Sequence, residues 1–194
     1  MNTHYSRLLL VLLLFTMVGC GKDVTTYHAN GHKESEGNLR DNKKHGLWTE
    51  WHENGQKQSE GHCKNGKQDG LWTEWDENGQ KWREQHFKNG EWDGFWTLWY
   101  KNGKKRSEAH YKDGEKEGLE TEWYANGQKW REQHFKNGKK DGLGTAWHEN
   151  GQKALEKHYK NGEQDGLETW WHENGQKASE YHYKNGKEVS RKKF

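Results

Sequence analysis

Residues 51–74 read WHENGQKQSEGHCKNGKQDGLWTE, and this 24-residue unit recurs along most of the 194-residue chain. Tryptophans spaced 24 residues apart mark the recurrence: Trp51, Trp75, Trp99, Trp123, Trp147 and Trp171. Tyr27 lies another 24 residues upstream, so seven units begin at residues 27, 51, 75, 99, 123, 147 and 171. Repetition at a short fixed period indicates an array of stacked units, each too small to bury a core alone.

Two turn-forming pairs recur in every unit, Asn54-Gly55 and Asn65-Gly66 in the stretch quoted above. Asn-Gly favours the two positive φ values of a two-residue type I′ hairpin turn. In the first unit Asn42 replaces the second glycine, and Asn adopts this conformation at some cost. Two such turns in every 24 residues leave no segment long enough for a stable helix. The sequence therefore predicts an all-β fold, an elongated antiparallel array of β-hairpins.

The turns also predict how neighbouring strands are aligned. With two-residue loops at both turns, His62 faces Asp69 and Gly70 faces Phe87. In that register an aromatic ring covers the backbone of a strand glycine. A bulge at the Asp-Gly pair, which shifts this register by one residue, is the alternative.

The same register assigns side chains to two faces of the sheet. Leu71 and Trp75 lie on one face with Glu60, whereas Trp72 and Phe87 point to the other. Equivalent residues recur after two strands, about 10 Å apart. The tryptophans named above therefore form a ladder, and a second ladder beside it consists of Leu47, Leu71, Phe95, Leu119, Leu143 and Leu167.

The recurring pattern Tyr/Phe-Lys-Asn-Gly-Lys-x-x-Gly-Leu-Trp-x-x-Trp-x-x-Asn-Gly is similar to the MORN-repeat variant, a type often grouped with antitoxin-like proteins of toxin–antitoxin pairs. The resemblance covers nearly all of the chain from residue 27 onward. It implies a row of β-hairpins that makes an elongated, twisted sheet with a shallow groove, and it implies no catalytic residue. The chain departs from the pattern in using Trp where Tyr is common and in having a histidine in most units.

The N-terminal residues differ from the repeats. Leu8–Val18 is an apolar run of eleven residues, shorter than the about 20 that a spanning helix needs, and it is typical of the helical hydrophobic region of a secretory signal peptide. The sequence that closes it, Met-Val-Gly-Cys20, resembles a bacterial lipobox. This implies a signal peptide over 1–19, a lipid on Cys20, a short tether over 20–26 and repeats over 27–194. An ordinary signal peptide with an incidental cysteine is the alternative.

The residues around Cys20 also bear on location. No Asp follows it directly and Lys22 is basic, a pattern that in Gram-negative lipoproteins resembles outer-membrane sorting. We therefore expect an exported, lipid-anchored protein of the cell envelope. Cys63, the other cysteine, then has no disulfide partner. It occupies a position that is aromatic in later units, and we interpret it as a small apolar substitute.

The composition narrows the functional classes. Lys+Arg 32 and Asp+Glu 30 nearly cancel, so the chain lacks the field that gathers nucleic acid. Only 28% of residues are hydrophobic, against about 45–50% in ordinary domains, which argues against a conventional closed core. Aromatic content of 13% and the absence of Pro argue against disorder.

Acidic and imidazole side chains recur two residues apart and could carry chemistry. The members are Glu36, Glu60, Glu84, Glu108, Glu132, Glu156 and Glu180, with His62, His86, His110, His134, His158 and His182. Histidines about 10 Å apart cannot share one metal ion, whose ligand bonds are near 2 Å. No Ser or Cys nucleophile recurs beside them. We predict cross-strand ion pairs with Asp69 and its equivalents, weak metal capture as the alternative, and no catalytic site, structural metal or cofactor.

The tryptophans have two interpretations: packing within a one-layer sheet, or platforms that stack sugar rings or grip an extended polypeptide. Four of those outside the main ladder are expected to be exposed: Trp82, Trp92, Trp130 and Trp170. The candidate binding residues are Trp51, Trp75, Trp99, Trp123, Trp147, Trp171, Trp82 and Trp130. The predicted function is a non-catalytic, membrane-anchored module for protein–protein interaction, including an antitoxin- or immunity-like role. A carbohydrate- or cell-wall-binding array is the alternative, and an enzyme is not expected.

Overall fold

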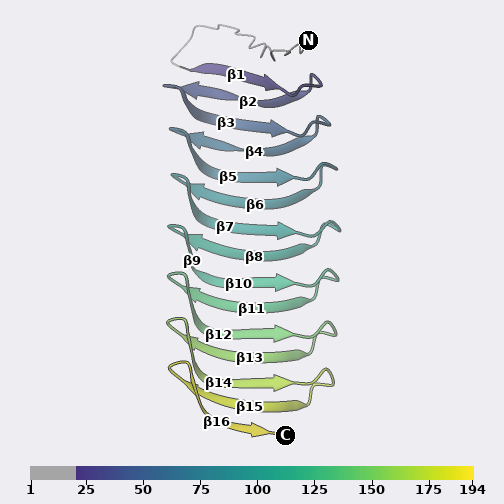
Figure 1. Cartoon of the computed structure of the whole chain (residues 1–194), viewed down its shortest axis with the longest axis vertical. Coiled ribbons are helices and arrows are strands. Elements are labelled where there is room, and N and C mark those ends of the chain that lie inside the picture. Colours follow the sequence, from purple (N-terminus) through teal and green to yellow (C-terminus); the bar gives the residue numbers. More distant parts are fainter. Residues whose placement is uncertain (1–20) are drawn as a thin grey trace, which may run out of the picture.

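The computed structural model describes residues 21–194, which form one open antiparallel sheet of sixteen strands. The strands pair in chain order from β1 to β16, except that β8 pairs with both the short β9 and β10 (Figure 1). No helix occurs in this part of the chain. The predicted all-β hairpin array is therefore confirmed. The predicted signal peptide and Cys20 lie outside the described residues.

The strands have similar lengths and recur with the sequence unit. Their bounds are β1 Lys22–Tyr27, β2 Lys33–Arg40, β3 Lys43–Trp51, β4 Lys57–Lys64, β5 Lys67–Trp75, β6 Lys81–Lys88, β7 Glu91–Trp99, β8 Lys105–Lys112, β9 Glu115–Lys116, β10 Gly118–Trp123, β11 Lys129–Lys136, β12 Lys139–Trp147, β13 Lys153–Lys160, β14 Glu163–Trp171, β15 Lys177–Lys184 and β16 Lys187–Lys193. We expected residues 20–26 to be a tether, but β1 pairs with β2 and is the edge strand of the sheet.

One of the two predicted turns has the expected conformation. Asn65 and Gly66 have φ values of 53° and 82°, and Lys64 faces Lys67 across them. Asp41 and Asn42 adopt the same pair of left-handed conformations in the first hairpin without a glycine. The type I′ turn is therefore confirmed at this edge of the sheet.

The turn at the opposite edge differs from the prediction. Gly79 N–H donates to the Asp76 carbonyl, and Asp76 N–H to the Gln80 carbonyl, both at 2.9 Å. Gly79 has a positive φ, whereas Asn78 does not. The loop is therefore longer than two residues, with a turn of ordinary hand followed by a left-handed glycine. The following strand carries a bulge, because Glu74 faces Arg83 but Trp75 faces Lys81.

A larger bulge lies at each Asp-Gly pair. Cys63 faces Gln68 and Gly61 faces Trp72, so three residues of β5 stand opposite one residue of β4. The predicted pairing of His62 with Asp69 is therefore wrong, and so is the one-residue alternative, because two extra residues are inserted. The equivalent bulge in the fourth unit separates β9 from β10.

The strand glycines have two different roles. Gly70 faces Phe87 as predicted, but a Cβ on Gly70 would meet nothing within 4 Å, and its φ is +99°. Glycine is needed there because the bulge requires a left-handed backbone, and the predicted ring cover is not the reason. The close aromatic contact is at Gly61, where a Cβ would lie 2.4 Å from atoms of the Trp72 indole.

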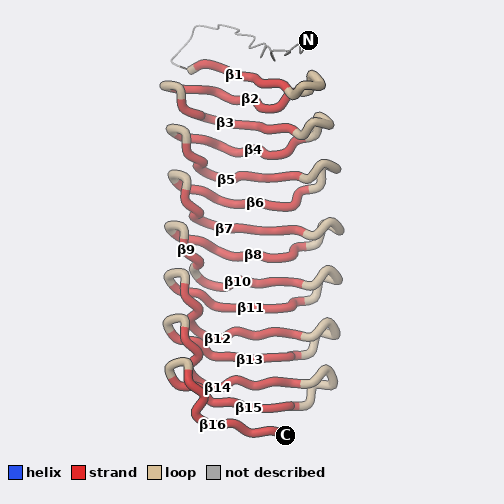
Figure 2. Tube along the Cα trace, viewed as in Figure 1, coloured by secondary structure: helices blue, strands red, loops and turns tan. Residues whose placement is uncertain are grey.

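Hydrogen bonds at both edges connect successive units beyond the strand ladder. Gly66 N–H donates to the Lys44 carbonyl at 2.9 Å, and equivalent bonds recur up to Gly186. At the other edge Asn54 Nδ2 donates to the Glu77 carbonyl at 2.6 Å. The loops form a regular row along each edge (Figure 2). Because each unit is bonded to its neighbours at three places, the array forms one continuous sheet.

The two faces of the sheet differ. The groove face carries Trp48, Cys63 and Trp72, the buried apolar cluster, against which Phe87 packs. The ladder face, on the opposite side, carries Trp51, Lys57, Glu60, Leu71, Trp75 and their equivalents. The division into faces agrees with the sequence prediction.

Candidate binding surfaces

The main tryptophan ladder alternates with lysines. Lys57 faces Trp51 across the strand pair and places its Nζ 5.7 Å from the ring centroid of Trp75, while its ammonium pairs with Glu60 at 2.6 Å. The same arrangement recurs for Lys33 over Trp51, Lys81 over Trp99, Lys129 over Trp147 and Lys153 over Trp171. A cation over an indole face is attractive. These half-buried rings are therefore engaged within the sheet, which favours the packing interpretation.

Four of the six members of the second predicted ladder are exposed. Leu47, Leu71, Phe95 and Leu119 have 41–57% of their surface open to solvent, whereas Leu143 and Leu167 are half-buried. The four lie in register on alternate strands of the ladder face, each opposite a histidine. An ordered row of exposed apolar side chains is typical of an interaction surface.

Two histidines of the predicted series, and Asp69 with several of its equivalents, contact backbone groups. His86 Nδ1 lies 3.2 Å from the Phe95 carbonyl, and His158 Nδ1 lies 3.1 Å from the Leu167 carbonyl. Asp69 accepts a hydrogen bond from the Asn89 N–H at 3.2 Å. No histidine among residues 21–194 pairs with a carboxylate, so the predicted cross-strand ion pairs are wrong. Within the same residues no three His, Cys, Asp or Glu side chains are placed to hold a metal ion.

Four tryptophans outside the main ladder are the most accessible, whereas Trp48 and Trp72 are buried. Trp82, Trp92, Trp130 and Trp170 are 37–44% exposed, as expected. Even these rings have cationic or aromatic neighbours: the Arg83 guanidinium lies 4.6 Å from the ring centroid of Trp82.

The groove face changes character along the array. The position filled by Trp48, Trp72 and Trp96 is occupied in later units by Glu120, Gly144 and Glu168. An apolar groove near the N-terminal units is thereby replaced by a charged one.

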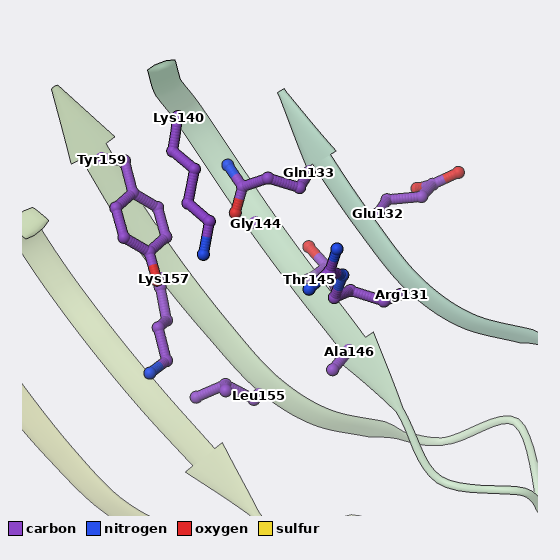
Figure 3. A pocket seen from close by; sticks show the side chains of 10 residues that line it. All are labelled: Arg131, Glu132, Gln133, Lys140, Gly144, Thr145, Ala146, Leu155, Lys157 and Tyr159. Atoms are coloured by element: carbon purple, nitrogen blue, oxygen red, sulfur yellow. The ribbon is translucent and has the colours of Figure 1, made fainter. Parts of the chain in front are cut away.

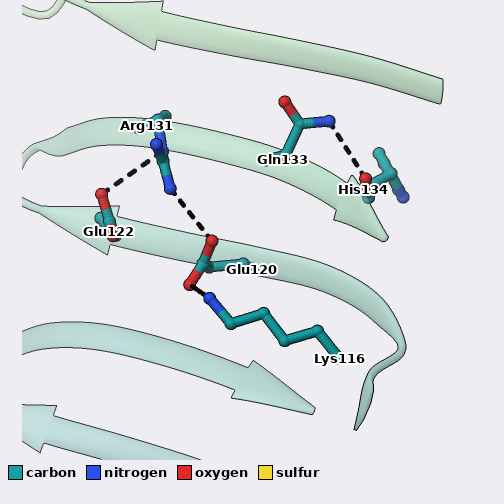
Figure 4. Close-up of polar contacts among 6 residues, drawn as sticks. All are labelled: Lys116, Glu120, Glu122, Arg131, Gln133 and His134. Atoms are coloured by element: carbon teal, nitrogen blue, oxygen red, sulfur yellow. Dashed lines mark hydrogen bonds and ion pairs between the residues drawn. The ribbon is translucent and has the colours of Figure 1, made fainter. Parts of the chain in front are cut away.

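The charged part begins with Glu120, whose side chain is 4% exposed. It is held between Lys116 and Arg131, and the Arg131–Glu120 contact is 3.0 Å (Figure 4). Arg131 Nε also lies 3.4 Å from Glu122. Burial raises the pKa of Glu122, an effect that Arg131 partly offsets and Glu120 reinforces.

Beside this network lies a cavity of about 190 Å³ at Gly144. Its lining includes Arg131, Lys140, Lys157 and Tyr159, whose side chains surround the glycine (Figure 3). Lys140 Nζ lies 5.0 Å from the ring centroid of Tyr159. Burial lowers the pKa of Lys140, and the neighbouring positive charges of Arg131 and Lys157 lower it further. This site was not predicted from the sequence, although the replacement of Trp by Gly at one repeat position indicates that a large side chain is missing there.

The environment of Cys63 disfavours a reactive thiol. It is buried in the apolar cluster, and burial raises the pKa of its thiol. A thiol that stays protonated is a poor nucleophile, so the interpretation as an apolar substitute agrees with its environment.

The fold and its period define a single-layer β-hairpin repeat protein. The chain belongs to the MORN repeat variant family, whose model matches residues 44–65, 68–89, 92–113, 116–137, 140–161 and 164–185. These matches cover more than half of the chain and share its 24-residue spacing, and each spans one hairpin across the longer turn. No curated protein matches the sequence. Within residues 21–194 there is no helix long and apolar enough to cross a membrane.

Proposed function

We propose that this repeat module is a non-catalytic, membrane-anchored platform that binds another protein through its ladder face. The observation that carries the proposal is the exposed row of Leu47, Leu71, Phe95 and Leu119. Single exposed apolar residues are common on soluble proteins, but four at equivalent positions in successive units favour a surface that a partner covers.

The polarity around this row suits a protein partner. Lysine–glutamate pairs such as Lys57–Glu60 run beside it on the same face, and polar groups around an apolar centre are typical of protein interfaces. The histidines opposite the row, His62 among them, add polar edges. The specific form that the family resemblance implies is an antitoxin- or immunity-like role, in which the array occupies a surface of a toxin.

Anchoring follows from Cys20, which lies only two residues before β1 begins at Lys22. A lipid at that cysteine would hold the first strand of the array close to the membrane surface. Labelled palmitate should be incorporated by the wild-type protein and not by the Cys20→Ser variant. Labelling that is equal in the two would refute the anchor.

The binding proposal is tested by cross-linking in intact envelopes, followed by reconstitution with the purified partner. Leu71→Ser and Phe95→Ser together should weaken the reconstituted complex by at least about tenfold, since buried apolar anchors dominate interface energies. Lys88→Ser, at an exposed hairpin tip, is the control and should leave affinity unchanged. A complex that is insensitive to the double variant would refute binding through this row.

A carbohydrate- or cell-wall-binding array remains the second candidate, and the exposed indoles of Trp82 and Trp130 favour it. Sugar rings stack on aromatic faces, and these two indoles are more exposed than those of the main ladder, with an arginine rather than a lysine against each ring. Cell-wall fragments should then quench tryptophan fluorescence in the wild type and not after Trp82→Leu and Trp130→Leu. Absence of saturable quenching would remove this candidate.

A further inference from the structure

The units on either side of Gly144 have a glutamate at the equivalent groove position. In the preceding unit the Lys116 ammonium bonds the carboxylate of Glu120, four residues later. In the following unit Gln164 bonds Glu168 with the same spacing. Lys140 is the equivalent donor between them, and the residue four positions later is Gly144. The donor has therefore been kept while its carboxylate acceptor has been lost.

The end of the Gln133 side chain takes the space directly next to the Gly144 Cα. Beside it a cavity of about 190 Å³ remains, and its lining includes the cations Arg131, Lys140 and Lys157. Arg131 is already paired with Glu120 at 3.0 Å, and Lys157 with Glu168 at 3.6 Å. Lys140 forms no ion pair within residues 21–194.

The electrostatics of the cavity favour an anion. Three cationic side chains share one partly buried space, and a further uncompensated positive charge there is costly. Arg131 is already compensated, because it pairs with Glu120 and its Nε lies 3.4 Å from Glu122. An anionic oxygen placed beside Lys140 would neutralise the one of these three cations that lacks an ion pair among residues 21–194, through a charge-assisted hydrogen bond.

The remaining walls limit the size and charge of the ligand. Ala146, Leu155 and the Tyr159 ring form an apolar side of the cavity. Glu120 and Glu168, the buried acids on either side, disfavour a second negative charge. The site therefore fits one carboxylate on a short apolar stem, similar to the glutamate side chains of the neighbouring units.

We propose that the cavity at Gly144 is a binding site for a carboxylate group, held by Lys140 with Arg131 and Lys157. The carboxylate belongs to a small organic acid or to an acidic side chain of a bound polypeptide. The site lies on the groove face and is independent of the protein-binding role proposed for the ladder face.

The test is a titration of the isotopically labelled protein, followed through the Gly144 amide and the Tyr159 ring by NMR. Butyrate represents a free acid, an end-blocked glutamate peptide represents a protein side chain, and inorganic phosphate represents a different oxyanion. Saturable shifts at Gly144 with butyrate or the peptide are expected, and the tighter of the two identifies the source. Absence of saturable shifts with both, or tighter binding of phosphate, would overturn the assignment.

Two variants separate this site from general charge attraction. Gly144→Glu supplies an internal carboxylate as in the neighbouring units, and Lys140→Gln removes the donor charge. Each should weaken binding by at least about tenfold, the effect of losing one charge-assisted hydrogen bond. Lys160→Gln, which removes an equal charge at an exposed hairpin end, should keep affinity within about twofold. Binding that survives both cavity variants, or that is lost equally in the control, would refute the proposal.

Discussion

Replacing Gly61 by Ala should disrupt the groove face at its most tightly packed point. The added Cβ would lie 2.4 Å from atoms of the Trp72 indole, far inside van der Waals contact. Trp72 is 5% exposed, and its Nε1 donates to the His62 carbonyl at 3.0 Å. The ring must therefore move, and its hydrogen bond must lengthen or break.

The cost can be estimated from these contacts. Overpacking of a close-packed site costs about 1–3 kcal/mol. Weakening the indole hydrogen bond adds about 1 kcal/mol, and the reduced freedom of the unfolded chain returns about 0.5 kcal/mol. We expect a net local destabilisation of about 2 kcal/mol, or roughly thirtyfold faster hydrogen exchange through local opening.

Hydrogen exchange resolved by residue is the suitable assay, because stability in a linear array is local. Amides of β4 and β5 should exchange faster in the Gly61→Ala variant, whereas those of β13 and β14 should not change. Gly144→Ala is the matched control, since a Cβ there meets the far end of the Gln133 side chain and not an aromatic ring. A Trp72→Ala background should largely remove the effect, because the clashing ring is absent.

One unit of the chain has an alanine at the position of Gly61, and there the tryptophan equivalent to Trp72 is also replaced. Ala109 occupies the position equivalent to Gly61, and the residue equivalent to Trp72 is Glu120 rather than an aromatic. If exchange in β4 and β5 stays within about twofold of wild type and the Trp72 indole resonance is unmoved, the packing argument is refuted.

Three further changes test other features. Asn42→Gly should stabilise the first hairpin by about 0.5 kcal/mol, because a left-handed non-glycine residue is disfavoured; unchanged exchange in β2 and β3 would contradict this. Lys57→Met should destabilise its unit by about 0.5–1.5 kcal/mol in urea unfolding, because it removes the ammonium that contacts the Trp75 ring and forms an ion pair. An equal effect from Lys88→Met would show that only the lost charge matters. Glu122 has a raised pKa in the folded state, so its ionisation costs stability as pH rises above the ordinary glutamate range. The Glu122→Gln variant should therefore be more stable than wild type at pH 7 and equal to it near pH 4. A difference in stability between the two proteins that does not change with pH would exclude this cause.

The period and the turn chemistry were sufficient to predict the fold class. Each recurring Asn-Gly pair lies where the chain reverses direction, with at least its glycine left-handed, and recurrence every 24 residues repeats the same hairpin. Alternation along a strand then separates Trp72 from Trp75 on opposite faces. These features are local in the chain, and the sequence was therefore a reliable guide to them.

The sequence was a poorer guide to the loops and bulges. Asn65-Gly66 and Asn78-Gly79 are the same dipeptide, yet only the first forms the two-residue turn. The difference arises because Asp76 and Gln80 pair across the longer loop, and side chains such as Asn54 bond to the loop of the next unit. Contacts between units thus select between turns that the local sequence permits equally.

The hairpins, their order along the sheet and the division of side chains between two faces could be predicted from the sequence alone. They follow from the φ preferences of the turn residues and from the alternation of side chains along a strand. The contacts between side chains and backbone groups of neighbouring units could be known only from the tertiary structure. It decided that His86 and His158 contact carbonyl groups, that lysines lie over most of the ladder indoles, and that a cavity lies among cations beside Gly144. The physical reason is distance along the chain, because side chains that are far apart in sequence meet only after bulges and loops have fixed the final register.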